Sequence, residues 1–320
     1  MLAFDVFNGD ADGICALAQL RLSEPKDSIL ITGVKRDIQL LEQVVPEQAA
    51  QVTALDISFD KNRADVQRLL EGGSSVFYCD HHFAGEIPEH GALTTLINTA
   101  PEVCTALLVN GLLKGAFAKW AVVGAFGDNL DGSAEALART LSLSQDQMSL
   151  YRQLGLCLNY NGYGPSLEDL YYHPADLYQA VVSCSTPEQF VVDQASVYAA
   201  LSEGYATDMA KAAELAPEVK DATHAVYLLP NEPWARRVSG VFSNSLVEQN
   251  PDRAHAILTD LGDDHYLVSV RAPLNRRQGA DTLVRQFPTG GGRAAAAGIN
   301  RLPSSDLSRF ISALADTYSG

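Results

Sequence analysis

The sequence predicts an α/β protein in which a domain with a parallel sheet is followed by a smaller α/β domain. Two observations favour this fold class. In the first half of the chain, apolar runs typical of strands alternate with helical stretches, which indicates a parallel sheet with helical connections. A second series of strands follows a long helical stretch, and 320 residues are enough for about two domains.

The elements of the first domain follow from its apolar runs and helical periodicity. Strands are predicted at residues 2–7, 28–33, 52–56 and 75–80. Helices are predicted at residues 14–22, 61–70, 104–113, 116–126, 134–141 and 145–156. The stretch 159–164, which is rich in Gly, Tyr and Asn, is expected to interrupt the helical pattern.

The second domain is predicted to follow a long helix at about residues 193–215, which ends near Pro217. Its strands are expected at residues 224–229, 254–259 and 266–271. We place the two domains at residues 1–195 and 196–320. The boundary lies between residues 183 and 217, because helices and not a Pro- or Ser-rich linker join the domains.

Composition narrows the range of functions. A formal net charge of −16 argues against binding of long duplex nucleic acid, since such binding depends on many Lys and Arg contacts to phosphates. No run approaches the roughly 20 apolar residues that cross a bilayer, and acids stand where a secretory signal has basic residues. We therefore expect a cytoplasmic protein without a membrane partner. The five cysteines include no C-x-x-C pair and are expected to be buried thiols.

Two acidic segments follow predicted strands. In the sequence Asn-Gly-Asp-Ala-Asp-Gly at residues 8–13, Asp10 and Asp12 lie two positions apart in a loop that the flanking glycines allow to turn sharply. The pair can hold hard cations through carboxylate oxygens, but for this segment alone a turn with a helix N-cap is an equally good interpretation. Asp56 also follows a strand, and alone it is better explained as a cap or turn residue.

Two further segments place acids and histidines at the ends of predicted elements. Asp80, His81 and His82 follow an apolar strand, and imidazole ligands suit Mn²⁺, Fe²⁺ or Zn²⁺ better than Mg²⁺. Asp128 ends a nearly uncharged helical run, and alone it would be an ordinary C-terminal turn. Because ligands collect beyond the carboxyl ends of parallel strands, we expect these segments to converge in space.

The order of the segments resembles the DHH phosphoesterase superfamily, through Asp10, Asp12, Asp56, Asp80, His81, His82 and Asp128. The resemblance is greatest to the nanoRNase and single-strand exonuclease branch. It continues in residues 98–99 and 104–105 and, in the last third, in residues 269–271 and 290–298, which look like the C-terminal domain associated with DHH domains. Two positions depart from the family pattern, because Val6 and Arg293 stand where many members have histidine.

The resemblance implies a catalytic site with two divalent metal ions, for which Mn²⁺ is the expected metal. It implies that Asp56 bridges the two ions and that His82 touches the scissile phosphate. The expected metal ligands are Asp10, Asp12, Asp56, Asp80, His81 and Asp128, with Asn8 in place of the missing histidine. The expected catalytic residues are Asp80, His81 and His82.

Contacts to substrate are expected from both domains, at His82, Asn161, Tyr163, Arg271, Gly290, Gly291, Gly292 and Arg293. The three glycines can let backbone N–H groups approach an anion, and the arginines on either side favour a phosphate pocket. For the glycines alone, a flexible loop is an equally good interpretation. A plain Tyr-rich surface turn is an equally good interpretation of residues 159–163.

Two classes of function stay open. The leading one is a phosphodiesterase or exonuclease that cleaves short oligonucleotides or linear dinucleotides such as pGpG to mononucleotides. Relatives in the family imply a phosphatase acting on pAp or a pyrophosphatase as alternatives. The non-enzymatic alternative is a nucleotide-binding sensor with a disabled metal site, which only Val6 and Arg293 support. Oligomerisation is open, and a homodimer is one option.

Overall fold

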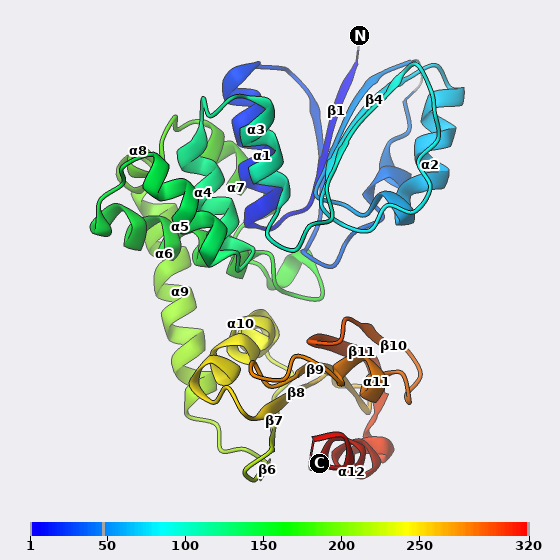
Figure 1. Cartoon of the computed structure of the whole chain (residues 1–320), viewed down its shortest axis with the longest axis vertical. Coiled ribbons are helices and arrows are strands. Elements are labelled where there is room, and N and C mark those ends of the chain that lie inside the picture. The colour runs from blue at the N-terminus through cyan, green and yellow to red at the C-terminus, as the bar shows by residue number, and fades with distance from the viewer. Residues whose placement is uncertain (1, 47–48, 319–320) are drawn as a thin grey trace. The chain divides into compact units, whose positions relative to one another are not determined.

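The computed structural model describes residues 2–46 and 49–318, which fall into two compact units, Met1–Glu203 and Gly204–Gly320 (Figure 1). The first unit is built on a five-stranded sheet whose neighbouring strands all run parallel. Its strand order is β2 (Ile29–Thr32), β1 (Ala3–Phe7), β3 (Gln51–Leu55), β4 (Ser75–Asp80) and β5 (Leu93–Ile97). The predicted parallel sheet is therefore confirmed.

Both faces of this sheet are covered by helices. Helices α1 (Ala11–Ser23) and α2 (Phe59–Glu71) lie on opposite faces (Figure 1). Because successive strand residues point to opposite faces, Val52 and Ala54 pack into the core beneath α2, whereas Leu55 packs into the core beneath α1. Burial on both faces explains why these strands are nearly continuous apolar runs.

A buried ion pair is built on Asp5 of β1, a strand that lies between β2 and β3. The Asp5 side chain is completely buried, and the Arg21 guanidinium of α1 donates to both of its oxygens, with Nε at 2.7 Å from Oδ2. The Ser28 hydroxyl donates to Asp5 Oδ2 at 2.6 Å. A buried carboxylate needs such partners, since burying it without them costs several kcal/mol. The pair therefore ties α1 and the start of β2 to the middle of the sheet.

The rest of the first unit is helical. Its helices are α3 (Thr105–Leu112), α4 (Ala118–Gly127), α5 (Asp131–Thr140), α6 (Gln145–Asn161), α7 (Pro174–Val182) and α8 (Pro187–Asp193), and α9 (Ala195–Ala213) crosses into the second unit. Close packing at Gly127 brings the end of α4 to the start of α1, because a Cβ there would lie 2.3 Å from the Cβ of Ala11. This contact fixes the position of Asp128, the C-cap residue of α4.

The second unit contains a mixed six-stranded sheet. Its order is β10 (Gly290–Gly292), β11 (Ala296–Pro303), β9 (His265–Arg271), β8 (Ala254–Asp260), β7 (His224–Leu229) and β6 (Val219–Lys220). Strands β7 and β8 pair in parallel, and the other pairs are antiparallel. Helices α11 (Ala280–Val284) and α12 (Leu307–Tyr318) cover one face, and α10 (Pro233–Gln249) packs on β7, β8 and β9.

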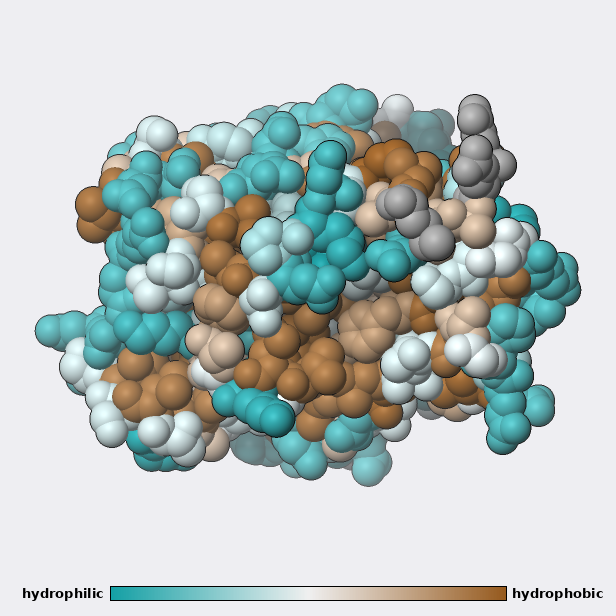
Figure 2. Space-filling view, turned by 90° about the horizontal axis from the view of Figure 1, so that it is seen from above, coloured by the Kyte–Doolittle hydropathy of each residue, from teal (hydrophilic) through white to brown (hydrophobic). Residues whose placement is uncertain are grey.

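The surface carries both polar and apolar side chains. Figure 2 shows hydrophilic residues interspersed with apolar patches on the face that it presents. Large apolar side chains with high exposure include Leu2, Ile29 and Val45. Within the described ranges, no helix combines the length and the hydropathy that a membrane span requires.

The predicted elements are present, and the structure adds elements that were not predicted, among them helices α7, α8, α10 and α12 and strands β6 and β11. There are three further differences. Helix α6 continues to Asn161, because Tyr160 and Asn161 are buried there. The stretch 159–164, which was predicted to interrupt the helical pattern, therefore begins inside a helix. Strand β5 was not predicted, because it lies at the sheet edge and its residues are only partly buried. The three glycines form the edge strand β10, so the interpretation as a flexible loop is wrong.

Candidate metal centre

Five aspartates lie at the carboxyl-terminal edge of the parallel sheet. Asp10 follows β1, Asp56 directly follows β3, and Asp80 is the last residue of β4. Asp12 lies in the first turn of α1, and Asp128 caps the end of α4. Since parallel strands end at one edge, the fold brings together acids that are far apart in the sequence.

Asp10 is the N-cap residue of α1. Its Oδ1 accepts the N–H groups of Asp12 at 3.0 Å and Gly13 at 3.1 Å. The helix-cap interpretation of this segment is therefore correct for one oxygen of Asp10, and the other oxygen faces the cluster of acids. The cap thus leaves Asp10 Oδ2 for its contact with Lys35.

Asp12 is held by the N-terminus of another helix. Its Oδ2 accepts the Thr105 N–H at 2.8 Å, and its Oδ1 accepts the Ala106 N–H at 2.7 Å. Both donors belong to the first turn of α3, where unpaired N–H groups and the helix dipole favour a negative charge. Motif reasoning alone did not predict this contact, although residues 104–105 were part of the family resemblance.

Asp56 lies at the middle of the cluster. Its φ of 57° places it in the left-handed region, which aspartate tolerates better than most residues. The side chain accepts from the Thr105 hydroxyl at 3.3 Å and lies 3.4 Å from His81 Nε2. Burial, followed by the neighbouring carboxylates of Asp12 and others, raises the pKa of Asp56 well above its ordinary value. Ionising all the acids therefore requires a nearby cation.

Asp80 orients the two histidines. Its Oδ1 accepts the His81 backbone N–H at 2.8 Å and contacts His82 Nδ1 at 2.7 Å. Burial opposes a charge on His82, but the hydrogen bond to Asp80 and the charges of Asp80, Asp128 and Asp12 together outweigh it and raise the pKa of the imidazole. The second oxygen of Asp80 is buried and has no hydrogen-bond partner in the described part of the chain. Asp80 thus contacts His82 directly, while one of its oxygens stays available.

The ligand atoms around His81 fit a divalent metal ion. Its Nε2 lies 3.4 Å from Asp56 Oδ1, 3.8 Å from Asp128 Oδ2 and 3.9 Å from Asp12 Oδ2. Two groups of potential ligands have all their atoms within 4.8 Å of one another, namely Asp12, His81 and Asp128, and Asp56, His81 and His82. Ligand atoms bound to one ion at about 2.1 Å lie about 3 to 4 Å apart. The mixture of carboxylate and imidazole suits Mn²⁺, Fe²⁺ or Zn²⁺.

A lysine that the sequence reasoning missed completes the cluster. The Lys35 ammonium donates to Asp10 Oδ2 and to Asn159 Oδ1, the latter at 3.0 Å, and lies 3.6 Å from Asp128 Oδ1. Burial opposes ionisation of Asp10, but the charge of Lys35 and the hydrogen bonds to Asp10 together outweigh it and hold the pKa of Asp10 below its ordinary value. The centre therefore includes a cation supplied by the chain itself.

Two other predicted site residues, Asn8 and Tyr163, contact this lysine, whereas Asn161 bonds Tyr172. Asn8 donates from Nδ2 to the Lys35 carbonyl at 3.1 Å, and its Oδ1 accepts the Asp10 N–H at 3.2 Å. The Tyr163 ring centroid lies 5.8 Å from Lys35 Nζ. Asn161 is buried, and its amide bonds the backbone N–H and C=O of Tyr172. Roles of Asn8 in metal binding and of Asn161 and Tyr163 in substrate binding stay predictions.

The predicted substrate residues of the second unit meet at one end of its sheet. Arg271, the last residue of β9, is paired across the strands with Ala296 of β11, beside the turn that begins at Arg293. Its Nε donates to Asn244 Oδ1 at 2.9 Å. Gly292 has a φ of 138°, and a Cβ there would lie 2.5 Å from the Cα of Ala297, so glycine is needed for the hairpin.

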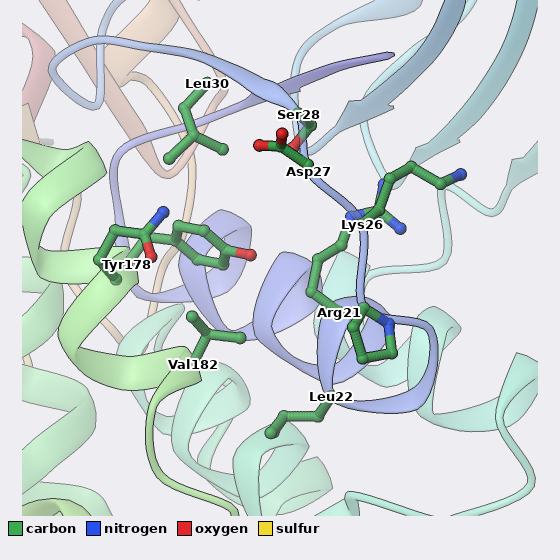
Figure 3. A pocket seen from close by; sticks show the side chains of 10 residues that line it. Arg21, Leu22, Lys26, Asp27, Ser28, Leu30, Tyr178 and Val182 are labelled. Atoms are coloured by element: carbon green, nitrogen blue, oxygen red, sulfur yellow. The ribbon is translucent and has the colours of Figure 1, made fainter. Parts of the chain in front are cut away.

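A separate cavity of about 430 Å³ lies between α1, β2 and α7 (Figure 3). Arg21, Lys26, Ser28 and Tyr178 are among the side chains that line it. It borders the start of β2, whereas Lys35 follows the end of that strand. The cavity and the metal centre are therefore at opposite ends of β2.

No protein-family model and no curated protein matches the sequence. Solved structures do match. An exonuclease RecJ bound to manganese has a TM-score of 0.65 at 16% identity, over 98% of this chain and 88% of that chain. The DHH domain of a member of the s1p family of ribosomal proteins has a TM-score of 0.64 at 13% identity, over 98% and 86% of the two chains.

A third solved structure covers nearly the whole of both chains. It is the pGpG-specific phosphodiesterase PggH from Vibrio cholerae, with a TM-score of 0.55 at 13% identity, over 98% of this chain and 96% of that chain. At these identities the likeness concerns the fold. Together with the aspartates and histidines at the sheet edge, it leads to one conclusion: the chain has the fold of the DHH superfamily phosphoesterases.

Proposed function

We propose that this protein is a divalent-metal-dependent phosphodiesterase that hydrolyses short oligonucleotides or linear dinucleotides of the pGpG type to mononucleotides. The observation that carries the proposal is the grouping of Asp12, His81 and Asp128 around one position, next to Asp56. Carboxylates and imidazoles in this arrangement suit a metal ion that acts on a phosphate. The RecJ exonuclease bound to manganese and the pGpG-specific phosphodiesterase support it, because they share the fold.

A small substrate is favoured by the charge of the chain. The formal net charge of −16 repels a long polyanion, whereas a dinucleotide presents few phosphates to that field. The similarity to the pGpG-specific enzyme extends over 98% of this chain, so both units have counterparts there. The charge favours linear dinucleotides over long strands, and a shared two-unit fold with a pGpG-specific enzyme is consistent with such a substrate.

We propose two divalent ions, with Mn²⁺ as the native metal. When bound, they would activate a water molecule for attack and neutralise the oxygens of the phosphoryl group. Asp12, His81 and Asp128 would hold one ion, and Asp56 would bridge it to the other. The N-terminus of α3 keeps Asp12 in place through two backbone hydrogen bonds, so this ligand is oriented before metal binds.

His82 is proposed to contact the scissile phosphate. Its imidazole is about a third exposed, and Nδ1 contacts Asp80 at 2.7 Å. This hydrogen bond favours the protonated ring and fixes its orientation, so Nε2 can donate to a phosphate oxygen. Asp80 is thus proposed to act through His82, and its free oxygen could still accept a further ligand.

In the second unit, we propose that Arg271 and Arg293 bind a phosphate of the substrate. Cross-strand pairing of Arg271 with Ala296 puts both arginines at one end of the sheet. Gly291 has open space around its Cα, so its backbone can be approached closely by an anion. Arginine suits this task because its planar guanidinium can donate two hydrogen bonds to one phosphate.

A substrate panel tests the proposal. The protein is stripped of metal with EDTA, Mn²⁺ is restored, and pGpG, other di- to pentanucleotides, pAp and pyrophosphate are each assayed by chromatography. We expect Mn²⁺-dependent release of mononucleotides, fastest with the shortest oligonucleotides. Faster hydrolysis of pAp or pyrophosphate would overturn the substrate assignment. Binding of pGpG without turnover at any Mn²⁺ concentration would overturn the assignment as an enzyme and favour a sensor.

A further inference from the structure

The backbone of Lys35 is fixed by two segments that border the metal centre. Its N–H donates to the carbonyl of Gly162, the C-cap residue of α6, at 2.8 Å. Its carbonyl accepts from Asn8 Nδ2 at 3.1 Å. Because both backbone groups are engaged, the side chain starts from a defined point and extends towards the aspartates.

The ammonium group of Lys35 lies where a cation between Asp10 and Asp128 would lie. It donates to Asp10 Oδ2 and to Asn159 Oδ1 at 3.0 Å, and Asp128 Oδ1 is 3.6 Å away. The Lys35 side chain is 25% exposed, and the Asp10 side chain is 4% exposed. At such low exposure the pair is weakly screened by water and salt, so it is stronger than a surface ion pair.

This contact occupies the oxygen of Asp10 that faces the cluster. The other oxygen already accepts two backbone N–H groups at the start of α1. Among the described residues, Asp10 belongs to neither group of potential metal ligands, whereas Asp12, Asp56 and Asp128 each belong to one. Because Lys35 Nζ lies between Asp10 Oδ2 and Asp128 Oδ1, and an ammonium group repels a divalent ion, an ion at this position must displace Lys35.

We propose that Lys35 is a positioning residue that occupies the cation position between Asp10 and Asp128, so that a second divalent ion binds there only by displacing its ammonium group. The inference rests on the proposed metal-dependent function. Asp12, His81 and Asp128, with Asp56 beside them, would hold the first ion without disturbing Lys35. In the metal-free protein, Lys35 offsets the repulsion among the buried carboxylates.

Removing the charge of Lys35 tests this inference through metal binding rather than activity. Mn²⁺ binding to EDTA-stripped protein is measured by calorimetry and by the electron paramagnetic resonance of free Mn²⁺. In the wild type, the second ion should bind at least about tenfold more weakly than the first. Lys35→Met should strengthen binding of the second ion at least about tenfold, because the ion no longer competes with an ammonium group.

Two control variants accompany Lys35→Met. Lys26→Met removes a lysine of similar exposure, 27%, that contacts Glu24 and Gln51 instead of the centre, and it should bind Mn²⁺ as the wild type does. Lys35→Arg keeps the charge and should keep a weak second site. If Lys35→Met does not fold, Lys35→Gln, which keeps a donor and removes the charge, takes its place.

Thermal unfolding in EDTA gives a second measurement. Without Lys35, Asp10 and Asp128 lose their counter-ion, so Lys35→Met should have a lower Tm in EDTA than both the wild type and Lys26→Met. Added Mn²⁺ should raise the Tm of Lys35→Met more than it raises the Tm of the other two proteins. An equal or higher Tm in EDTA would contradict the inference.

The outcomes separate this inference from the proposed function. Suppose that the wild type binds Mn²⁺ and hydrolyses pGpG, but Lys35→Met binds the second Mn²⁺ ion with unchanged or lower affinity. Then the role proposed for Lys35 is wrong and the enzyme assignment stands. If the wild type binds no Mn²⁺, both are wrong.

Discussion

The hydrogen bonds between Asp12 and helix α3 give Asp12 a structural role that can be measured separately from its proposed role in metal binding. Its two oxygens accept the N–H groups of Thr105 and Ala106 at 2.8 Å and 2.7 Å. Asp12→Ala leaves both buried donors unsatisfied, whereas Asp12→Asn retains one oxygen that can accept. An unsatisfied buried donor costs about 1–3 kcal/mol. We therefore expect Asp12→Ala to have a free energy of unfolding about 1–3 kcal/mol lower than Asp12→Asn.

The comparison of the two variants cancels the effect of charge, because both remove one carboxylate from the cluster. Urea unfolding in EDTA, followed by circular dichroism, measures the difference without metal. Asp27 is exposed, so Asp27→Ala and Asp27→Asn should differ by no more than about 0.5 kcal/mol. If Asp12→Ala proves as stable as Asp12→Asn, then the hydrogen bonds from α3 to Asp12 do not stabilise the fold.

Two predictions concern the second unit. Burial, together with the Arg253 charge, lowers the pKa of His255 to about 4 from 6.5, so only the unfolded chain holds the proton between these pH values. Because of this group, the free energy of unfolding should fall by about 1 to 2 kcal/mol between pH 7 and pH 5. Urea unfolding at a series of pH values should show that His255→Leu lacks this part of the pH dependence. An unchanged pH dependence of the free energy of unfolding in His255→Leu would contradict the prediction. Arg293→Ala should raise the KM for pGpG at least about tenfold with little change in kcat, while Arg285→Ala, on an exposed helix end, should not. Equal KM values in the two variants would remove Arg293 from the substrate site.

The parallel sheet could be predicted because its strands are apolar on both faces. Strands β1 and β3 are buried almost throughout, so each reads as a short apolar run followed by a polar turn. Strand β5 has partly exposed residues and two threonines, which gives no comparable pattern. The register of β10 could not be predicted either, since three glycines have no side chains to indicate a buried face.

The aspartates and histidines of the centre could be predicted because each follows a strand or helix whose end is visible in the sequence. Lys35 could not, since its partners Asp10 and Asn159 lie 25 and 124 positions away. Its position depends on where the end of α6 meets the end of β2, which no local pattern encodes. The hydrogen bond from Thr105 to Asp12 spans 93 positions and depends in the same way on tertiary packing.

The central claim is that the centre around His81 binds a divalent metal ion and uses it to cleave a phosphodiester. The most direct measurement is release of GMP from pGpG by the EDTA-stripped protein after Mn²⁺ is restored, for the wild type, His81→Ala and His90→Ala. His90 is an exposed histidine outside the centre and serves as the matched control. We expect Mn²⁺-dependent hydrolysis by the wild type and His90→Ala, and a loss of at least about a hundredfold in His81→Ala. Hydrolysis by His81→Ala at the wild-type rate, or by the wild type without any divalent metal, would contradict the claim.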